Sequence, residues 1–489
     1  MIGRKDIVAE KNELSGQMIS GMSWKFAERL CAQGVSFIVS IVLARILMPE
    51  DYGVVAIINV FMAIADVLLT SGLSSALIQR PKVNSRDFST IFYCNFLLSC
   101  FIYILMFISA PFLAAYYNLP ILKPAMRVFA IRLPISAFQT IQSAIISRNM
   151  EFKKFFFSTI GGTLISAVVG IGLALNGFGV WALIIQYLTN TCIDTIILAL
   201  IVRWHPGLEF DVKHAKPLLS YGWRIMLTDF IGTVFNNLGD FVIGVKYTSS
   251  QLAFYSKGKQ LPMLVRANIY TTLISVLFPA MSKVNSNIQE LKALTRKSVS
   301  MLSYIIFPLM CGMIAVANNM TAVLYTKKWL PIVPFIYIVC IEAMISVLGT
   351  VTLQSIKAYG RSDIMLKMEF IKKPIMIASL LIAMRYGVYA IALTLPLNTI
   401  LELFINGIVA KRLIGYNLKL QLFDCLSALL YSIIMGSVVF CIGFIKCNTL
   451  VVLVLQVVVG IFIYLLISLI TRNPNFLIIK QFIKTKLNR

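Results

Sequence analysis

The chain has 489 residues, of which 59% are hydrophobic and only 13% are charged, with a formal net charge of +24. Soluble globular proteins carry about 25% charged residues, so this composition excludes an ordinary soluble protein. Windows of about 20 apolar residues, the length that crosses a hydrocarbon core, recur from end to end, whereas the ~10-residue alternating segments of a transmembrane β-barrel are absent from the sequence. The sequence predicts an all-α integral membrane protein.

The chain begins with a polar segment, residues 1–17, followed by an apolar stretch that starts near residue 18. This stretch is too long for the apolar region of a signal peptide and lacks a small-residue cleavage site. We therefore expect no cleavable signal and interpret the stretch as the first membrane span.

Hydropathy predicts about fourteen transmembrane helices joined by short connections. In chain order they are 18–46, 52–79, 88–117, 121–147, 153–176, 179–203, 218–245, 250–281, 293–318, 333–357, 363–385, 387–410, 424–445 and 449–470. Turn signals such as Asn118-Leu119-Pro120 and His205-Pro206-Gly207 separate them.

Basic residues outside the spans are distributed unequally. The N-terminus and the even-numbered connections carry most of them, which is the positive-inside pattern. This pattern predicts a multi-pass protein of the bacterial inner membrane with both termini in the cytoplasm. It also accounts for the net charge without a polyanionic partner, so we expect no nucleic-acid binding.

A short internal repeat is present. Ser20-Gly21-Met22-Ser23-Trp24-Lys25 resembles Leu219-Ser220-Tyr221-Gly222-Trp223-Arg224, and the connections at 49–53 and 249–253 are also about 200 residues apart. A match this short also arises by chance, but it favours two six-helix lobes, a common transporter plan with its site between the halves. The predicted organisation is a cytoplasmic N-terminus (1–17), an N-lobe (18–203), a cytoplasmic inter-lobe loop (204–217), a C-lobe (218–410), helices thirteen and fourteen (411–470) and a cytoplasmic tail (471–489).

Charged residues inside the predicted spans are the candidate functional residues, because a charge in mid-bilayer costs about 2.5–3.5 kcal/mol on insertion scales. The cations that we expect to line a hydrated cavity and bind substrate are Lys25, Arg29, Arg132, Arg224, Lys257 and Arg266. The acids that are candidates for ion coupling, or for pairing with these cations, are Glu28, Asp66, Asp229, Asp240, Glu342 and Glu402. Helical spacing places several of them on common faces, such as Lys25, Glu28 and Arg29 on the first helix.

Two interpretations of these charges stay open. Long basic side chains near a helix end, such as Lys25 and Arg224, can extend to the headgroups or form structural ion pairs. In a cavity, cations such as these instead favour an anionic cargo, since guanidinium groups bind phosphate bidentately.

The chain offers little for covalent chemistry. Its nine cysteines are scattered, mostly within apolar segments, and have no metal-ligand spacing. The two histidines, His205 and His214, lie in the predicted inter-lobe loop and are typical of surface residues. We expect no metal, no cofactor and no catalytic residues.

Several segments resemble the polysaccharide-transport family. They are Ser20–Arg29, Ile41–Gly53, Gly72–Arg80, Gln139–Phe152 and Tyr255-Ser256-Lys257-Gly258. The sub-branch that they resemble is that of the Wzx/WzxC-type flippases of lipopolysaccharide and exopolysaccharide synthesis, within the multidrug/oligosaccharidyl-lipid/polysaccharide (MOP) exporter superfamily. The resemblance is strong over the N-terminal half, and over the C-terminal half it rests mainly on helix count.

This resemblance implies a V-shaped, fourteen-helix transporter that is not an enzyme. It implies translocation of undecaprenyl-pyrophosphate-linked oligosaccharide repeat units from the cytoplasmic to the periplasmic leaflet by alternating access. Membrane lipid and the polymerase and chain-length components of the polysaccharide pathway are the other implied partners.

Two alternatives compete with a flippase. A drug or small-cation exporter of the same superfamily would be expected to prefer acidic cavity residues. A membrane glycosyltransferase or polysaccharide polymerase usually needs a sizeable extracytoplasmic loop with carboxylates, whereas the longest odd-numbered connection here, near 319–332, offers only Lys327, Lys328 and Trp329 as notable groups.

Overall fold

The computed structural model describes residues 4–70, 77, 84–207 and 212–487, and every regular element in these ranges is helical. The chain divides into two compact units, an N-terminal unit (Met1–Ala253) and a C-terminal unit (Phe254–Arg489). The resemblance segment Gly72–Arg80 lies almost entirely outside the described residues.

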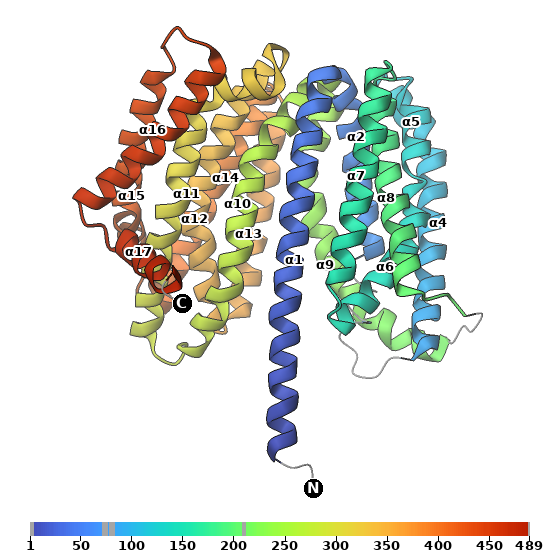
Figure 1. Ribbon diagram of the computed structural model, residues 1–489, viewed down its shortest axis with the longest axis horizontal. Coiled ribbons are helices and arrows are strands. Elements are labelled where there is room, and N and C mark those ends of the chain that lie inside the picture. Colours follow the sequence, from blue (N-terminus) through green and yellow to red (C-terminus); the bar gives the residue numbers. More distant parts are fainter. Residues whose placement is uncertain (1–3, 71–76, 78–83, 208–211, 488–489) are drawn as a thin grey trace. The chain divides into compact units, whose positions relative to one another are not determined.

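Among the described residues, eight helices and the start of a ninth belong to the N-terminal unit (Figure 1). They are α1 (Arg4–Ile46), α2 (Pro49–Thr70), α4 (Ser85–Tyr116), α5 (Leu122–Phe129), α6 (Arg132–Asn149), α7 (Lys153–Leu175), α8 (Val180–Val202), α9 (Val212–Lys246) and the first residues of α10 (Ser249–Lys283). The remaining elements belong to the C-terminal unit. They are α11 (Ile288–Tyr325), η1 (Lys327–Ile332), α12 (Val333–Ala358), α13 (Ser362–Ala383), α14 (Val388–Ile414), α15 (Leu418–Ile442), α16 (Thr449–Ile470) and α17 (Pro474–Leu487).

Each of the fourteen predicted spans overlaps helical residues, although residues 71–76, 78 and 79 of the second span lie outside the described ranges. Twelve segments among the described residues are long and apolar enough to cross a membrane. The other two are α9 and α13. Helix α13 carries Lys367, Glu369, Lys372 and Lys373, which reduce its mean hydropathy. The multi-pass helical fold is therefore confirmed, and the exact number of spans is approximate.

The predicted fourth span, 121–147, is two helices rather than one. Helix α5 ends at Phe129 and α6 begins at Arg132. Pro134 has no N–H to donate to the Ala130 carbonyl four residues earlier, and its ring would clash with that carbonyl. The N–H of Leu133 donates to Ala130 instead, at 2.9 Å. The break places Arg132 at the first position of α6.

Small residues let α7 approach its neighbours. Ser158, Gly162, Ser166 and Gly170 recur every fourth residue, so they form one face of α7, and α8 packs closely against this helix. A Cβ at Gly162 would lie 3.1 Å from the Asn190 carbonyl oxygen of α8. Close backbone approach through small residues is a typical basis of helix association in lipid.

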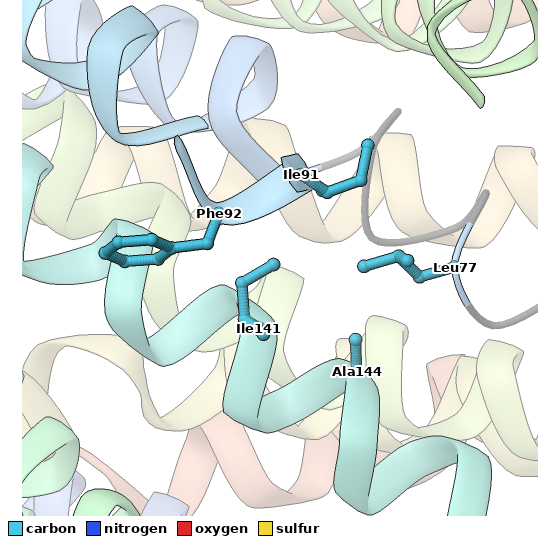
Figure 2. Packing of buried hydrophobic residues seen from close by; sticks show 5 residues of the cluster. All are labelled: Leu77, Ile91, Phe92, Ile141 and Ala144. Carbon is cyan, nitrogen blue, oxygen red and sulfur yellow. The ribbon is translucent and has the colours of Figure 1, made fainter. Parts of the chain in front are cut away.

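An apolar cluster joins α4, α6 and the segment after α2. Figure 2 shows Ile91 and Phe92 of α4 gathered with Ile141 and Ala144 of α6 and with Leu77. All five side chains are buried, and the Phe138 ring packs on the Phe92 ring with centroids 4.6 Å apart. This cluster holds α6, and hence Arg132 and Gln139, against the rest of the N-terminal unit.

Helix α11 is the centre of the C-terminal unit and packs on α12, α15 and α16 (Figure 1). Arg296 of α11 donates two hydrogen bonds to Asp424 of α15, from Nε to Oδ2 at 2.9 Å and from Nη2 to Oδ1 at 2.6 Å. The Tyr416 hydroxyl donates to Asp424 Oδ2 at 2.9 Å, and burial raises the pKa of Tyr416. A hydrogen bond of 2.7 Å from Tyr464 to the Tyr304 carbonyl joins α16 to α11.

Candidate functional site

Lys25 and Glu28 form an ion pair on α1. Lys25 Nζ lies 2.6 Å from Glu28 Oε2, and the same ammonium lies 4.7 Å from the centroid of the Phe155 ring of α7. Half of the Lys25 side chain is exposed, whereas only 11% of the Glu28 side chain is. The pair therefore has one buried carboxylate and one cation at the surface of the N-terminal unit.

A second carboxylate belongs to the same cluster and was not among the sequence candidates. Asp194 of α8 accepts a short hydrogen bond from Gln139 Nε2 of α6, and it interacts electrostatically with Glu28 and Lys25. Asp66 was selected because it is an acidic residue within an apolar span. Asp194 meets the same criterion, so the sequence analysis could have selected it. Its proximity to Glu28 depends on the packing of α7 between α1 and α8, which hydropathy does not reveal.

Arg29 is exposed on α1, one turn from Lys25. Arg224 lies on α9, but its side chain is outside the described residues. Two acids on α9 differ in environment, because Asp229 is exposed and Asp240 is buried.

Arg132 pairs with Asp66. The Nη2 of Arg132, at the start of α6, donates a short hydrogen bond to Asp66 Oδ2 of α2, and the guanidinium lies 5.3 Å from the centroid of the Phe129 ring. The pair joins two helices that are distant in sequence, and it depends on the helix break at residues 130–131. Its charges neutralise each other, which reduces the positive charge that Arg132 can offer to an anion.

Arg266 of α10 pairs in the same way with Glu342 of α12. Its Nη1 donates to both carboxylate oxygens of Glu342, whose side chain is 11% exposed, and Thr399 of α14 donates to Glu342 Oε1 at 3.4 Å. Next to this pair, the hydroxyl groups of Tyr270 and Ser346 are 2.9 Å apart. The result is a polar network that joins α10, α12 and α14 inside the C-terminal unit.

The remaining candidates lie apart from these pairs. Lys257 of α10 is buried, and its ammonium lies 5.1 Å from the centroid of the Tyr325 ring. Glu402 of α14 is half-exposed and lies 3.6 Å from the ammonium of Lys372, a buried lysine of α13 that the sequence analysis did not select. The structure therefore brings most of the candidate acids to cations, in separate pairs rather than in one cluster.

The two repeat segments 49–53 and 249–253 touch each other within the N-terminal unit. Ser250 Oγ donates to Glu50 Oε1 at 2.7 Å, a hydrogen bond between residues 200 positions apart. A Cβ added at Gly53 would lie 2.1 Å from the Ser249 carbonyl oxygen, so only glycine permits this approach of α2 and α10.

The described residues contain no group of three or more His, Cys, Asp or Glu side chains that could hold a metal ion. What they provide is a set of charged and amide groups in otherwise apolar helices, with Lys25 and Arg29 at the surface of α1. Such groups can hold a polar, anionic group at the level of the membrane without any covalent step.

Known proteins resemble this chain in sequence and in fold. Residues 42–334 match the family described as "Polysaccharide biosynthesis protein". The lipopolysaccharide biosynthesis protein WzxC of Escherichia coli (strain K12) is 24% identical over 404 residues, which cover 81% of this chain and 80% of that protein. The teichuronic acid biosynthesis protein TuaB of Bacillus subtilis (strain 168) is 22% identical and covers 84% of each chain.

Among solved structures, the lipid II flippase MurJ in an inward closed conformation matches with a TM-score of 0.71 and 17% identity, covering 93% of this chain and 99% of that one. This likeness confirms the all-helical membrane fold that the resemblance implied, with the number of helices approximate. The family match spans more than half of the chain and agrees with the apolar helices of both units. This chain is a multi-pass membrane protein that belongs to the polysaccharide biosynthesis protein family.

Proposed function

We propose that the chain translocates undecaprenyl-pyrophosphate-linked oligosaccharide repeat units from the cytoplasmic to the periplasmic leaflet of the inner membrane, by alternating access between lobes at 18–203 and 218–410. The observation that carries the proposal is the position of Lys25 and Arg29 on an exposed surface of α1, a span of which only 17% is buried within the protein. Arg29 is exposed, and Lys25 beside it is half-exposed although it is paired with Glu28, so this surface suits the pyrophosphate of a lipid-linked sugar. The apolar tail of such a cargo can stay in the bilayer.

The physical problem of the transport supports this assignment. The head of a lipid-linked oligosaccharide is polar and charged, and an unpaired charge in hydrocarbon is costly. A protein surface with cations and hydrogen-bond donors lowers the free-energy cost of moving the charged head through the membrane. This transport requires no covalent bond to form or break. Polymerase and chain-length components of the pathway would act on the units after translocation.

The decisive experiment deletes the gene in its host and measures, with a leaflet-specific probe of the sugar head, where the lipid-linked units accumulate. Complete units on the cytoplasmic face, and their disappearance when the gene is restored, would support a flippase. Units that reach the outer face but stay unpolymerised would support a polymerase instead. No change in lipid-linked sugar would favour a small-molecule exporter.

Arg29→Ala is expected to lower the export rate about tenfold or more, since a charge-assisted hydrogen bond contributes about 1.5–3 kcal/mol. Arg29→Lys should retain part of the rate because it keeps the charge but loses the planar fork that binds phosphate bidentately. Arg224→Ala and Arg224→Lys are expected to follow the same order. Export of surface polysaccharide at equal protein levels measures the effect.

The matched control is Arg385→Ala, which removes an exposed arginine from the connection between α13 and α14. It should leave export unchanged. An Arg29→Ala protein that inserts normally and exports at the rate of the unaltered protein would remove Arg29 from the proposed binding surface.

The proposed orientation, with both termini in the cytoplasm, predicts that the connection between α15 and α16 faces the periplasm. Cys447 in this connection is exposed. A membrane-impermeant maleimide applied to cells with a permeabilised outer membrane should label Cys447, and Cys447→Ser should abolish that label. Labelling only after the inner membrane is lysed would reverse the orientation.

A further inference from the structure

A groove of about 480 Å³ lies where α1, α7 and the connection between α6 and α7 meet. Its lining includes three aromatic side chains, Trp24, Phe152 and Phe157, and three charged ones, Glu151, Lys153 and Lys154. None of the intramembrane ion pairs described above contributes to it. The groove belongs to the N-terminal unit alone.

Local structure fixes the walls of this groove. Met150 caps α6 in the left-handed conformation, with φ of 56°, and so turns the chain toward α1. At Gly21 a Cβ would lie 2.8 Å from Phe152 Cδ2, so the absence of a side chain lets the Phe152 ring approach α1. The Trp24 ring meets the Phe156 ring edge-on, with centroids 5.3 Å apart, which holds the indole in place.

The charges of the groove leave one surplus positive charge. Lys154 Nζ lies 2.7 Å from Glu151 Oε2, so this lysine and this glutamate neutralise each other. The Lys153 ammonium lies 5.5 Å from the centroid of the Trp24 ring, and the ion pairs found in the described ranges do not include it. Lys153 is exposed and is therefore available to an anion in the groove.

The groove lies at the boundary of the apolar stretches. The membrane-spanning part of α1 starts at Ser23, next to the groove residue Trp24, and that of α7 starts at the groove residue Lys153. Tryptophan and lysine at such a boundary are characteristic of the headgroup level of a bilayer. An occupant of the groove is therefore expected to come from the lipid leaflet as well as from water.

We propose that this groove binds the phosphodiester headgroup of an anionic phospholipid, such as phosphatidylglycerol. A phosphodiester carries a single negative charge, which matches the single surplus charge at Lys153. A pyrophosphate would bring more negative charge than the groove can neutralise. The aromatic walls would cover the glycerol and the first methylene groups of the acyl chains. The groove adjoins the proposed cargo surface on α1 but offers Lys153 rather than Lys25 or Arg29 to the phosphate.

The test uses the full chain in lipid nanodiscs or detergent and measures the binding of phosphatidylglycerol and phosphatidylcholine with identical acyl chains by native mass spectrometry. The unaltered protein is expected to prefer phosphatidylglycerol. Lys153→Gln should reduce that preference about fivefold, because a lysine at an anionic surface contributes about 1 kcal/mol. Lys153→Arg should retain it, and Trp24→Leu should weaken binding of phosphatidylglycerol. The control Lys123→Gln, an exposed lysine of α5, should have no effect.

Three outcomes would overturn the proposal. The first is equal binding of the two phospholipids, and the second is a preference that Lys153→Gln leaves intact. The third is displacement of phosphatidylglycerol by an equal concentration of inorganic phosphate or of a polyprenyl pyrophosphate, which would identify another source of the phosphate. Elution of Lys153→Gln at the same volume as the unaltered protein on size exclusion verifies that the variant is folded.

Discussion

Glu342→Ala is expected to destabilise the C-terminal unit by about 3 kcal/mol, the low end of the cost of removing one partner of a buried ion pair. The reason is that Arg266 would keep its charge inside the helix bundle without the carboxylate that accepts its hydrogen bonds. Thr399 would lose an acceptor as well. Unfolding of the purified chain in mixed detergent, followed by helical circular dichroism, measures the loss.

The exposed ion pair between Arg361 and Asp363 provides the matched control for Glu342→Ala. About half of each of these side chains is exposed, so Asp363→Ala should leave the free energy of unfolding almost unchanged. The double variant Arg266→Met/Glu342→Leu should recover most of the stability, since replacing both partners by apolar residues removes the unpaired charge. Equal losses in Glu342→Ala and Asp363→Ala would show that burial of the pair has no energetic consequence.

The export rate of the double variant also separates two roles of Arg266. If Arg266 acts only as a partner of Glu342, a stable double variant exports normally. If the cation also binds the cargo, as the sequence analysis predicts, export falls although stability is restored. Comparing the export rate with the free energy of unfolding, at equal protein levels, shows whether Arg266 acts only as the partner of Glu342 or also binds the cargo.

Gly53→Ala is expected to reduce export severely, because its Cβ would lie 2.1 Å from the Ser249 carbonyl oxygen. Overpacking of this kind costs about 1–3 kcal/mol, which lowers the population of the conformation that contains the α2–α10 contact by about 5–150-fold. The contact lies within the N-terminal unit, so we expect its loss to slow the proposed translocation without unfolding the chain.

Disulfide formation reports on the same contact directly. A chain with Glu50→Cys and Ser250→Cys should cross-link readily under mild oxidation, since Ser250 Oγ lies 2.7 Å from Glu50 Oε1. Adding Gly53→Ala should slow the cross-link, whereas adding Gly172→Ala, at a glycine of α7 with no atom within 4 Å of a Cβ, should not. Cross-linking at an unchanged rate in the Gly53→Ala chain would mean that α2 and α10 adapt to the added methyl group.

The internal repeat illustrates how sequence and structure complement each other. The sequence alone aligned residues 49–53 with 249–253 as counterparts, on the basis of their spacing and their place at helix starts. It gave no reason to expect that the two segments touch. The direct hydrogen bond from Ser250 to Glu50 accompanies the packing of α9 on α2, which depends on side chains spread over both helices.

For the charged residues, too, the sequence predicted one part of the site and the structure was needed for the other. Apolar windows containing isolated charges identified Arg132, Asp66, Arg266 and Glu342 as unusual, because any charge in a membrane span is costly. Which charges form pairs could not be predicted, since the partners are 66 and 76 residues apart. Their roles in binding the cargo stay predictions that the variants above test.

The sequence by itself determined that the chain is a helical membrane protein, where its spans lie and which family it resembles. These properties follow from hydropathy and local motifs, which depend on residues close together in the chain. Only the tertiary structure decided that Asp194 interacts electrostatically with Lys25 and Glu28 and that the fourth span is broken before Arg132. It also decided that the Ser249 carbonyl oxygen lies too close to position 53 for any side chain. These features depend on contacts between helices. Lipid tails are as apolar as the helix surfaces, so hydrophobicity does not select one helix partner over another. Shape complementarity and hydrogen bonds between helices therefore determine the arrangement.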